Sequence, residues 1–132
     1  MVKYRSTRHL KLQRNGGNMQ SHITIQKDTG TWSIRAGGAV IGESNSAIEL
    51  TEGDHAPVMY FPRSDIAMAF LEPSSETTTC RHKGTASLYS IETKSRTIQN
   101  AAWSYEGENA SIDDIKNHVA FHTSELVTVE RL

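Results

Sequence analysis

Residues 84–105, GTASLYSIETKSRTIQNAAWSY, carry the pattern that decides the fold. On either side of the polar ETKSR segment (92–96), apolar and polar residues alternate, and both runs contain β-branched and aromatic side chains. An alternation of period two predicts β-strands, because successive side chains of a strand point to opposite faces. The two runs therefore predict two strands joined by a polar turn.

Shorter runs of the same kind continue through the chain from Met19 onward. Gly37-Gly38 predicts a tight hairpin between two of them, because both central residues of a type I′ turn need positive φ. Strands are expected at HITIQ (22–26), TWSIRA (31–36), AVIGES (39–44), AIEL (47–50), VMYF (58–61) and ELVTVE (125–130). Together with residues 84–105, these runs predict about eight short strands.

Two segments between the strands favour short helices. RSDIAMAFL (63–71) suits one helix with Ser64 as its N-cap, and IDDIKNHVAF (112–121) suits a second helix that Ser111 caps. EPSSETTT (72–79) is dominated by Ser, Thr and Glu and predicts a polar loop. The expected architecture is one mainly β domain with two short helices.

The composition suits a single small globular domain. Of 132 residues, 36% are apolar and 22% are charged, so the chain is apolar enough to build a core. Its apolar runs are only a few residues long, too short to span a bilayer. Cys80 is the single cysteine, which excludes an internal disulfide and a cysteine-rich zinc site. We therefore expect a cytoplasmic protein without a metal or cofactor.

Positive charge is concentrated in residues 1–18, which contain no acid. We hypothesise that translation starts at Met19 and that residues 1–18 are a mis-assigned start; the alternative is a disordered basic leader. Residues 19–132 then hold 9 basic residues against all 15 acidic ones, a balance of −6. Such an acidic body argues against nucleic acid as a partner, because phosphate binding needs a basic face.

Four separated blocks share their order and spacing with one bacterial family. The blocks are YFPRSDI (60–66), TTTCRHKGTASLYS (77–90), AAWSY (101–105) and IKNHVAFH (115–122). Over roughly residues 19–130 the chain resembles the domain of unknown function 427, a family that also carries a nucleotidyltransferase-like label. The resemblance implies a β-tent, a small single domain of curved antiparallel sheets, and it implies no established reaction.

The sequence departs at several points from enzymes of this architecture. The zinc sites of β-tent proteins use pairs of cysteines, whereas Cys80 stands alone, so no metal is expected. Leu88 stands where the family usually has an aromatic residue, and Arg81-His82 replaces a commoner Pro-aromatic pair. Nucleotidyl transfer needs carboxylates that hold Mg²⁺ on phosphates, whereas Asp113-Asp114 is typical of helix capping. The residues therefore give the nucleotidyltransferase label little support.

Lys83-Gly84 is the first candidate for a ligand contact. The glycine leaves space for a ligand near the ammonium, although a turn glycine beside a solvated lysine is the alternative. Arg63 is a second candidate, since a guanidinium binds carboxylate or phosphate through paired hydrogen bonds; alternatively, it pairs with Asp65. The same blocks contain four aromatic candidates: Trp103 and Tyr105 on one strand face, Tyr60, and Tyr89. Such residues are usually core, and they would line a pocket only on a concave face.

Cys80 is the candidate nucleophile. The basic residues 81–83 would lower the pKa of its thiol if their side chains pointed toward it. On an extended segment only His82 would share the face of Cys80, and free cysteines are commonly buried, so a structural thiol is the alternative. His118 and His122 would meet on a helix, but no metalloprotease pattern accompanies them.

We expect a domain that binds a small anionic ligand in a concave pocket. Lys83 and Arg63 would meet the charge of the ligand, and the aromatic residues would enclose its apolar part. One alternative is a thiol-dependent enzyme with Cys80 as nucleophile and His82 as base, which would need an external thiol. The other alternative is a protein–protein interaction module that binds through an exposed strand or aromatic face.

Overall fold

The computed structural model describes residues 22–132, so the predicted leader (1–18) lies outside the described residues. The strands are β1 (Ile23–Asp28), β2 (Trp32–Ala36), β3 (Ala39–Ser44), β4 (Ala47–Glu52), β5 (Val58–Pro62), β6 (Leu71–Cys80), β7 (Gly84–Glu92), β8 (Thr97–Ala110), β9 (His118–Phe121) and β10 (Val127–Arg131). Three 3₁₀ turns, η3 (Arg63–Asp65), η4 (Met68–Phe70) and η5 (Asp113–Ile115), complete the described elements. None of these turns is long and apolar enough to cross a membrane.

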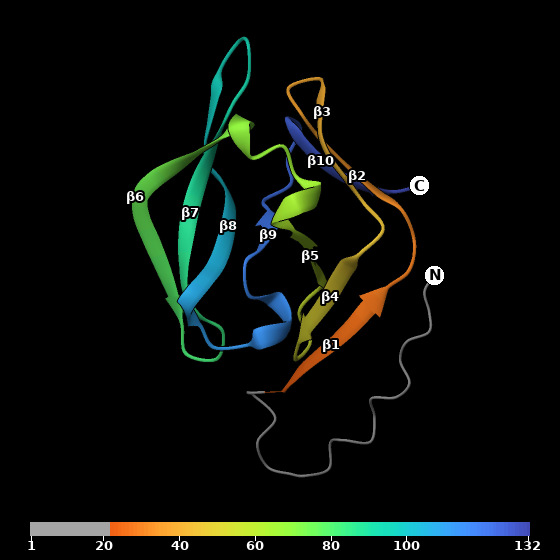
Figure 1. Cartoon of the computed structure of the whole chain (residues 1–132), viewed down its shortest axis with the longest axis vertical. Helices are drawn as coiled ribbons and strands as arrows, with labels where there is room; N and C mark the ends of the chain where they lie inside the picture. Colours follow the sequence, from red (N-terminus) through yellow and green to blue (C-terminus); the bar gives the residue numbers. More distant parts are fainter. Residues whose placement is uncertain (1–21) are drawn as a thin grey trace.

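The strands form two antiparallel sheets (Figure 1). The larger sheet has seven strands in the order β1-β4-β5-β9-β8-β7-β6, and the smaller sheet has three in the order β10-β2-β3. β1 and β6 are the edges of the larger sheet and do not pair with each other, so the described chain forms no closed barrel. The mainly β, antiparallel fold predicted from the alternation is confirmed.

The larger sheet is strongly curved. Two side-chain contacts across its concave face show this. Lys83, just before β7, donates to Glu52 at the end of β4 over 2.9 Å, although β5, β9 and β8 lie between these strands. In a flat sheet, four strand spacings would hold β4 and β7 roughly 19 Å apart. Trp103 Nε1 in β8 likewise donates to Tyr60 Oη in β5 over 3.2 Å, across β9. The curvature brings residues from both halves of the sheet to one hollow face.

Two apolar cores follow from the alternation of side chains. The concave-face core is built from Ile48, Leu50, Tyr60, Ala86, Tyr105, Ile115 and Ala120. The other face of the sheet packs on the smaller sheet, in a core that includes Ile34, Ile41, Phe61, Tyr89, Val119 and Phe121. Neighbours in one strand enter different cores, as Tyr60 and Phe61 do, because successive side chains point to opposite faces.

The glycine pair forms the predicted hairpin between β2 and β3. Gly37 and Gly38 have φ of +57° and +88°, and Ala36 pairs with Ala39 across the turn. Both positive angles agree with the type I′ turn expected from the sequence. The prediction of a two-residue hairpin at this position is confirmed.

The helix predicted over residues 63–71 is wrong. The segment instead contains η3, η4 and the first residue of β6. Ala67 N donates to Ile41 O over 2.8 Å, and Ile66 forms an isolated bridge with Gly42. These backbone contacts with β3 replace the hydrogen bonds that a helix would make. Ser64 does not cap η3, which Pro62 precedes without any side-chain cap.

The helix predicted over residues 112–121 is also wrong. A single turn, η5, follows Ile112 rather than a Ser111 cap, and the rest of the segment forms strand β9. Asn117 separates the two with a φ of +59°, a left-handed conformation that interrupts any helix. β9 lies between β5 and β8 and is buried on both faces, so its run of apolar residues does not alternate.

The prediction of a polar loop over residues 72–79 is also wrong, because this segment forms strand β6. β6 is an edge strand that pairs only with β7, and most of its residues are exposed. Because both faces are largely uncovered after Leu71, which is buried in the core, the strand needs no apolar alternation. Pro73 lies at an irregularity of the ladder, where a missing N–H is tolerated. With β6 and β9 the described chain has ten strands rather than about eight.

Candidate functional site

A cavity of about 250 Å³ opens on the concave face of the larger sheet. We call it the concave-face cavity; its lining is Val58, Tyr60, Thr78, Lys83, Leu88, Asn100, Trp103, Tyr105 and His122. The strand register explains the grouping, because Leu88 pairs with Trp103 and therefore shares its face. Of the predicted site residues, the structure brings together Lys83, Tyr60, Trp103 and Tyr105 here.

Lys83 enters the cavity from the tight turn between β6 and β7. Its Nζ donates to Glu52 Oε1 over 2.9 Å, and the two side chains are 17% and 23% exposed. Burial is the largest single effect and disfavours the ammonium, but the hydrogen bond to Glu52 and the neighbouring acidic groups together outweigh it, and the pKa of Lys83 is raised. The hydrogen bond from Lys83 lowers the pKa of Glu52. The pair is therefore ionised at neutral pH.

The ammonium of Lys83 retains free donors. An ammonium carries three N–H groups, and within residues 22–132 Glu52 is the only hydrogen-bond partner of Nζ. Since Lys83 also lines the concave-face cavity, two N–H groups remain for an acceptor there. Glu52 itself was missed by the sequence analysis, because the segment TEGDH contains no motif that singles out its carboxylate.

Two buried phenols add further donors to the concave-face cavity. Burial raises the pKa of both Tyr60 and Tyr105, so each keeps its proton well above neutral pH. Tyr60 Oη already accepts from Trp103 Nε1, which leaves its O–H to donate. No hydrogen bond of the Tyr105 hydroxyl occurs within the described residues. The polar groups of this cavity thus suit a ligand that supplies oxygen acceptors.

Arg63 and Tyr89 lie away from this cavity. Both donate to Glu106 Oε2, over 2.6 and 2.5 Å, and Tyr89 belongs to the core on the other face of the sheet. The Arg63–Asp65 pair considered from the sequence is not formed, because Asp65 accepts from Ser44 Oγ over 2.6 Å. The structure therefore separates the two cations that we expected to share one pocket.

Gly84 contacts the backbone of the neighbouring strand. Its φ is +107°, and a Cβ built there would overlap the carbonyl oxygen of Asn109. Ser111 N donates to Lys83 O over 3.0 Å, which fixes this close approach. The space beside Gly84 is thus filled by the chain itself. A ligand contact at Gly84 stays a prediction.

Cys80 ends β6 and is half-buried. Cys80 pairs with Gly84, so residues 81–83 form a three-residue turn, and the alternation assumed for an extended segment does not apply. No hydrogen bond joins Cys80 to His82 in the described part of the chain. The pairing of nucleophile and base that thiol catalysis requires is therefore not formed here, and the thiol-enzyme hypothesis stays a prediction.

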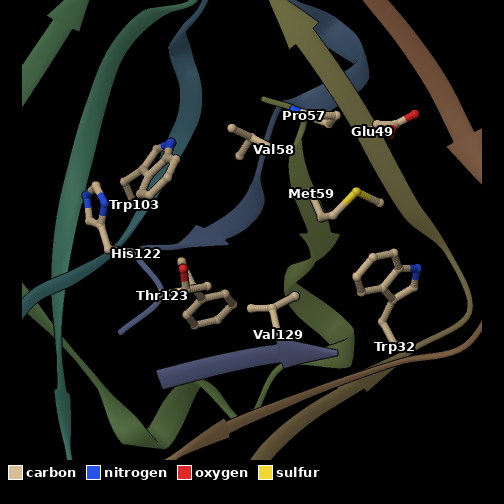
Figure 2. Close-up of a pocket in the computed structure, with 10 residues that line it drawn as sticks. Trp32, Glu49, Pro57, Val58, Met59, Trp103, His122, Thr123 and Val129 are labelled. Carbon is tan, nitrogen blue, oxygen red and sulfur yellow. The ribbon is translucent and has the colours of Figure 1, made fainter. Parts of the chain in front are cut away.

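A second, larger cavity of about 600 Å³ lies where the two sheets meet. We call it the junction cavity (Figure 2); its lining is Trp32, Glu49, Pro57, Val58, Met59, Trp103, Phe121, His122, Thr123 and Val129. The imidazole of His122 packs against Trp103 with ring centroids 4.4 Å apart and the two ring planes tilted by 41°. Trp32 and Glu49 were missed as site candidates, because their place in the same cavity as Trp103 depends on the packing of one sheet on the other.

The two histidines considered as a pair do not meet. β9 separates them: His118 begins the strand and lies at a third cavity of about 410 Å³, whereas His122 follows the strand and contacts Trp103. Within residues 22–132, no group of three or more His, Cys, Asp or Glu side chains gathers at one point where it could hold a metal ion.

Comparison with known proteins places the chain in a family. No curated protein matches the sequence. The family described as "Domain of unknown function (DUF427)", labelled NTP_transf_9, matches residues 24–131. That range contains every strand from β2 to β10 and almost all of β1. The resemblance that the four sequence blocks indicated is confirmed, and the chain belongs to the family Domain of unknown function (DUF427).

Proposed function

We propose that this domain binds a small anionic ligand in the concave-face cavity. The observation that carries the proposal is the convergence of donors: Lys83, Tyr60 and Tyr105 line one small cavity, and each has a hydrogen to donate. A carboxylate or phosphate accepts such bonds more strongly than a neutral group does. The apolar part of the ligand would lie against Val58 and Trp103, which line the same cavity.

The charge balance limits the ligand to a small net charge. Glu52 already neutralises Lys83, so a ligand oxygen would join an existing ion pair rather than meet an isolated cation. Hydrogen bonds from a partly buried ammonium still favour an anion over its neutral analogue. Arg63, which Glu106 holds elsewhere, is not part of this proposed site. The lone cysteine agrees with a cytoplasmic setting, which is part of the proposal.

The proposal is tested with two probes that differ only in charge. We would titrate the protein with 2-naphthoate and with 2-naphthamide, and follow the indole N–H signals by NMR. The carboxylate should bind about tenfold more tightly than the amide, because a charge-assisted hydrogen bond contributes about 1.5–3 kcal/mol. Lys83→Gln should reduce this preference to about twofold or less.

Arg63→Gln is the matched control for Lys83→Gln. It also breaks one partly buried ion pair to a glutamate, but away from the cavity. Naphthoate binding should therefore stay within about twofold of wild type in Arg63→Gln. Equal affinities for the two probes in the wild-type protein, or an unchanged preference in Lys83→Gln, would contradict the proposal.

A further inference from the structure

The junction cavity adjoins the concave-face cavity. Three residues, Val58, Trp103 and His122, line both. β5 and β9 pair only at Phe61–Val119 and Pro62–His118, and Val58 and His122 lie beyond this short ladder. The two strands therefore part beside Trp103, and the boundary between the cavities consists of side chains rather than of a paired sheet. A ligand held by Lys83 has this boundary directly beside it.

The walls of the junction cavity are aromatic. Figure 2 shows Trp32 of β2 and Trp103 of β8 on opposite sides, with Met59 and Val129 between them in this view. Indole rings offer large flat faces, and aromatic groups gain from ring–ring contacts in addition to their burial. The thioether of Met59 also packs well on aromatic rings. This lining suits a flat ring.

Few charges face the junction cavity. Glu49 is its only acidic lining residue, and His122 is the only other ionisable one. Glu49 makes no ion pair within residues 22–132. A second anionic group would meet this carboxylate in a lining that holds no lysine or arginine, so the cavity does not favour one. Its chemistry differs from that of the concave-face cavity, which offers the ammonium of Lys83 and two phenol hydroxyls.

We infer that the ligand of this domain is an elongated molecule with an acidic group at one end and a flat aromatic ring at the other. The acidic end binds at Lys83 in the concave-face cavity, the chain passes Trp103 and His122, and the ring enters the junction cavity. This inference rests on the proposed function for its acidic end. The evidence for the aromatic end of the ligand is independent of that proposal, because it comes from the residues that line the junction cavity.

The test uses three probes: 2-naphthoate, 5-(2-naphthyl)pentanoate, and pentanoate, which has the acid and chain without the ring. The chain has two tryptophans: Trp32 lines only the junction cavity, so its indole N–H signal in NMR titrations reports that cavity alone, whereas Trp103 lines both cavities. Naphthoate should shift the signal of Trp103 alone, whereas naphthylpentanoate should shift both signals. The long probe should bind at least tenfold more tightly than naphthoate or pentanoate.

Three variants separate the ends of the ligand. Trp32→Ala, in a residue that lines only the junction cavity, should remove the advantage of the long probe and leave naphthoate binding within about twofold of wild type. Val129→Phe should do the same by filling the junction cavity, and it keeps the test valid if Trp32→Ala fails to fold. Lys83→Gln should weaken the binding of all three acids.

The outcomes distinguish this inference from the proposed function. A long probe that binds no more tightly than naphthoate, or that leaves the Trp32 signal in place, overturns the inference while the carboxylate preference still stands. If Lys83→Gln changes the binding of none of the three acids, the proposed function fails, and the acidic end of the inferred ligand fails with it. Shifts of both indoles support both proposals when Val129→Phe abolishes the Trp32 shift and Lys83→Gln weakens binding.

Discussion

Lys83 and Gly84 are adjacent in the sequence, but they make different contacts in the structure. The ammonium of Lys83 crosses the concave face to Glu52, whereas Gly84 lets β7 approach the backbone of Asn109. From the sequence the glycine was expected to leave room for a ligand. The sequence pattern does not show that β8 fills this space, because the approach of β8 to Gly84 is set by tertiary packing.

Gly84→Ala should destabilise the protein more than a change at another left-handed glycine. A Cβ at Gly84 meets a carbonyl oxygen in addition to the strained φ of +107°, and we expect a loss of at least about 3 kcal/mol. Gly38→Ala is the control, since its φ is +88° with nothing near the added methyl, and it should lose about 1 kcal/mol. Urea unfolding measures both, and equal losses would contradict the close approach.

At the scale of elements, the sequence predicts strands well where apolar and polar residues alternate along the run. Residues 84–105 alternate clearly and form β7, a turn and much of β8. The prediction fails at both extremes of burial, because β9 is apolar on both faces and β6 is exposed on both. In neither strand does the residue pattern have period two. Local propensity then favours a helix or a loop, and only the neighbouring strands decide otherwise.

Val119 in β9 provides the test of this burial. Val119 is 0% exposed and packs in the core between the sheets, so Val119→Ala should cost about 2 kcal/mol. Val40→Ala in β3 removes the same two methyl groups from a side chain that is 46% exposed, and it should change stability by less than about 0.5 kcal/mol. Similar losses for the two variants, measured by urea unfolding, would place β9 outside the core.

At the scale of the whole molecule, the curvature of the larger sheet creates the candidate site. Trp103 and Tyr105 were expected to share a strand face, and the strand register confirms this. That Tyr60 and Lys83 join them, and that Arg63 and Tyr89 do not, follows from how the sheet curls and from which face each residue occupies. No pattern within one strand contains this information. The sequence therefore predicts the members of each face, but not which faces meet.

The Lys83–Glu52 ion pair holds the curled sheet across its concave face, so its protonation should appear in the stability of the whole domain. The pKa of Glu52 is lowered by the hydrogen bond from Lys83, and this contribution is present above the unfolded value of about 4.3 and lost as pH falls through the folded pKa. The pKa of Lys83 is raised, so its contribution is present below the unfolded value of about 10.4 and lost as pH rises through the folded pKa.

Lys83→Met should therefore lower stability by about 1–3 kcal/mol between about pH 5 and pH 10, and by progressively less on either side of that range. The measurement is the free energy of unfolding in urea, for wild type and variant, across pH 3 to 11. Glu43→Gln removes an exposed carboxylate that has no ion pair within residues 22–132, and it should show no such plateau. A constant difference between wild type and Lys83→Met down to pH 3 would mean that packing of the lysine stem, rather than the ion pair, joins the two halves of the sheet.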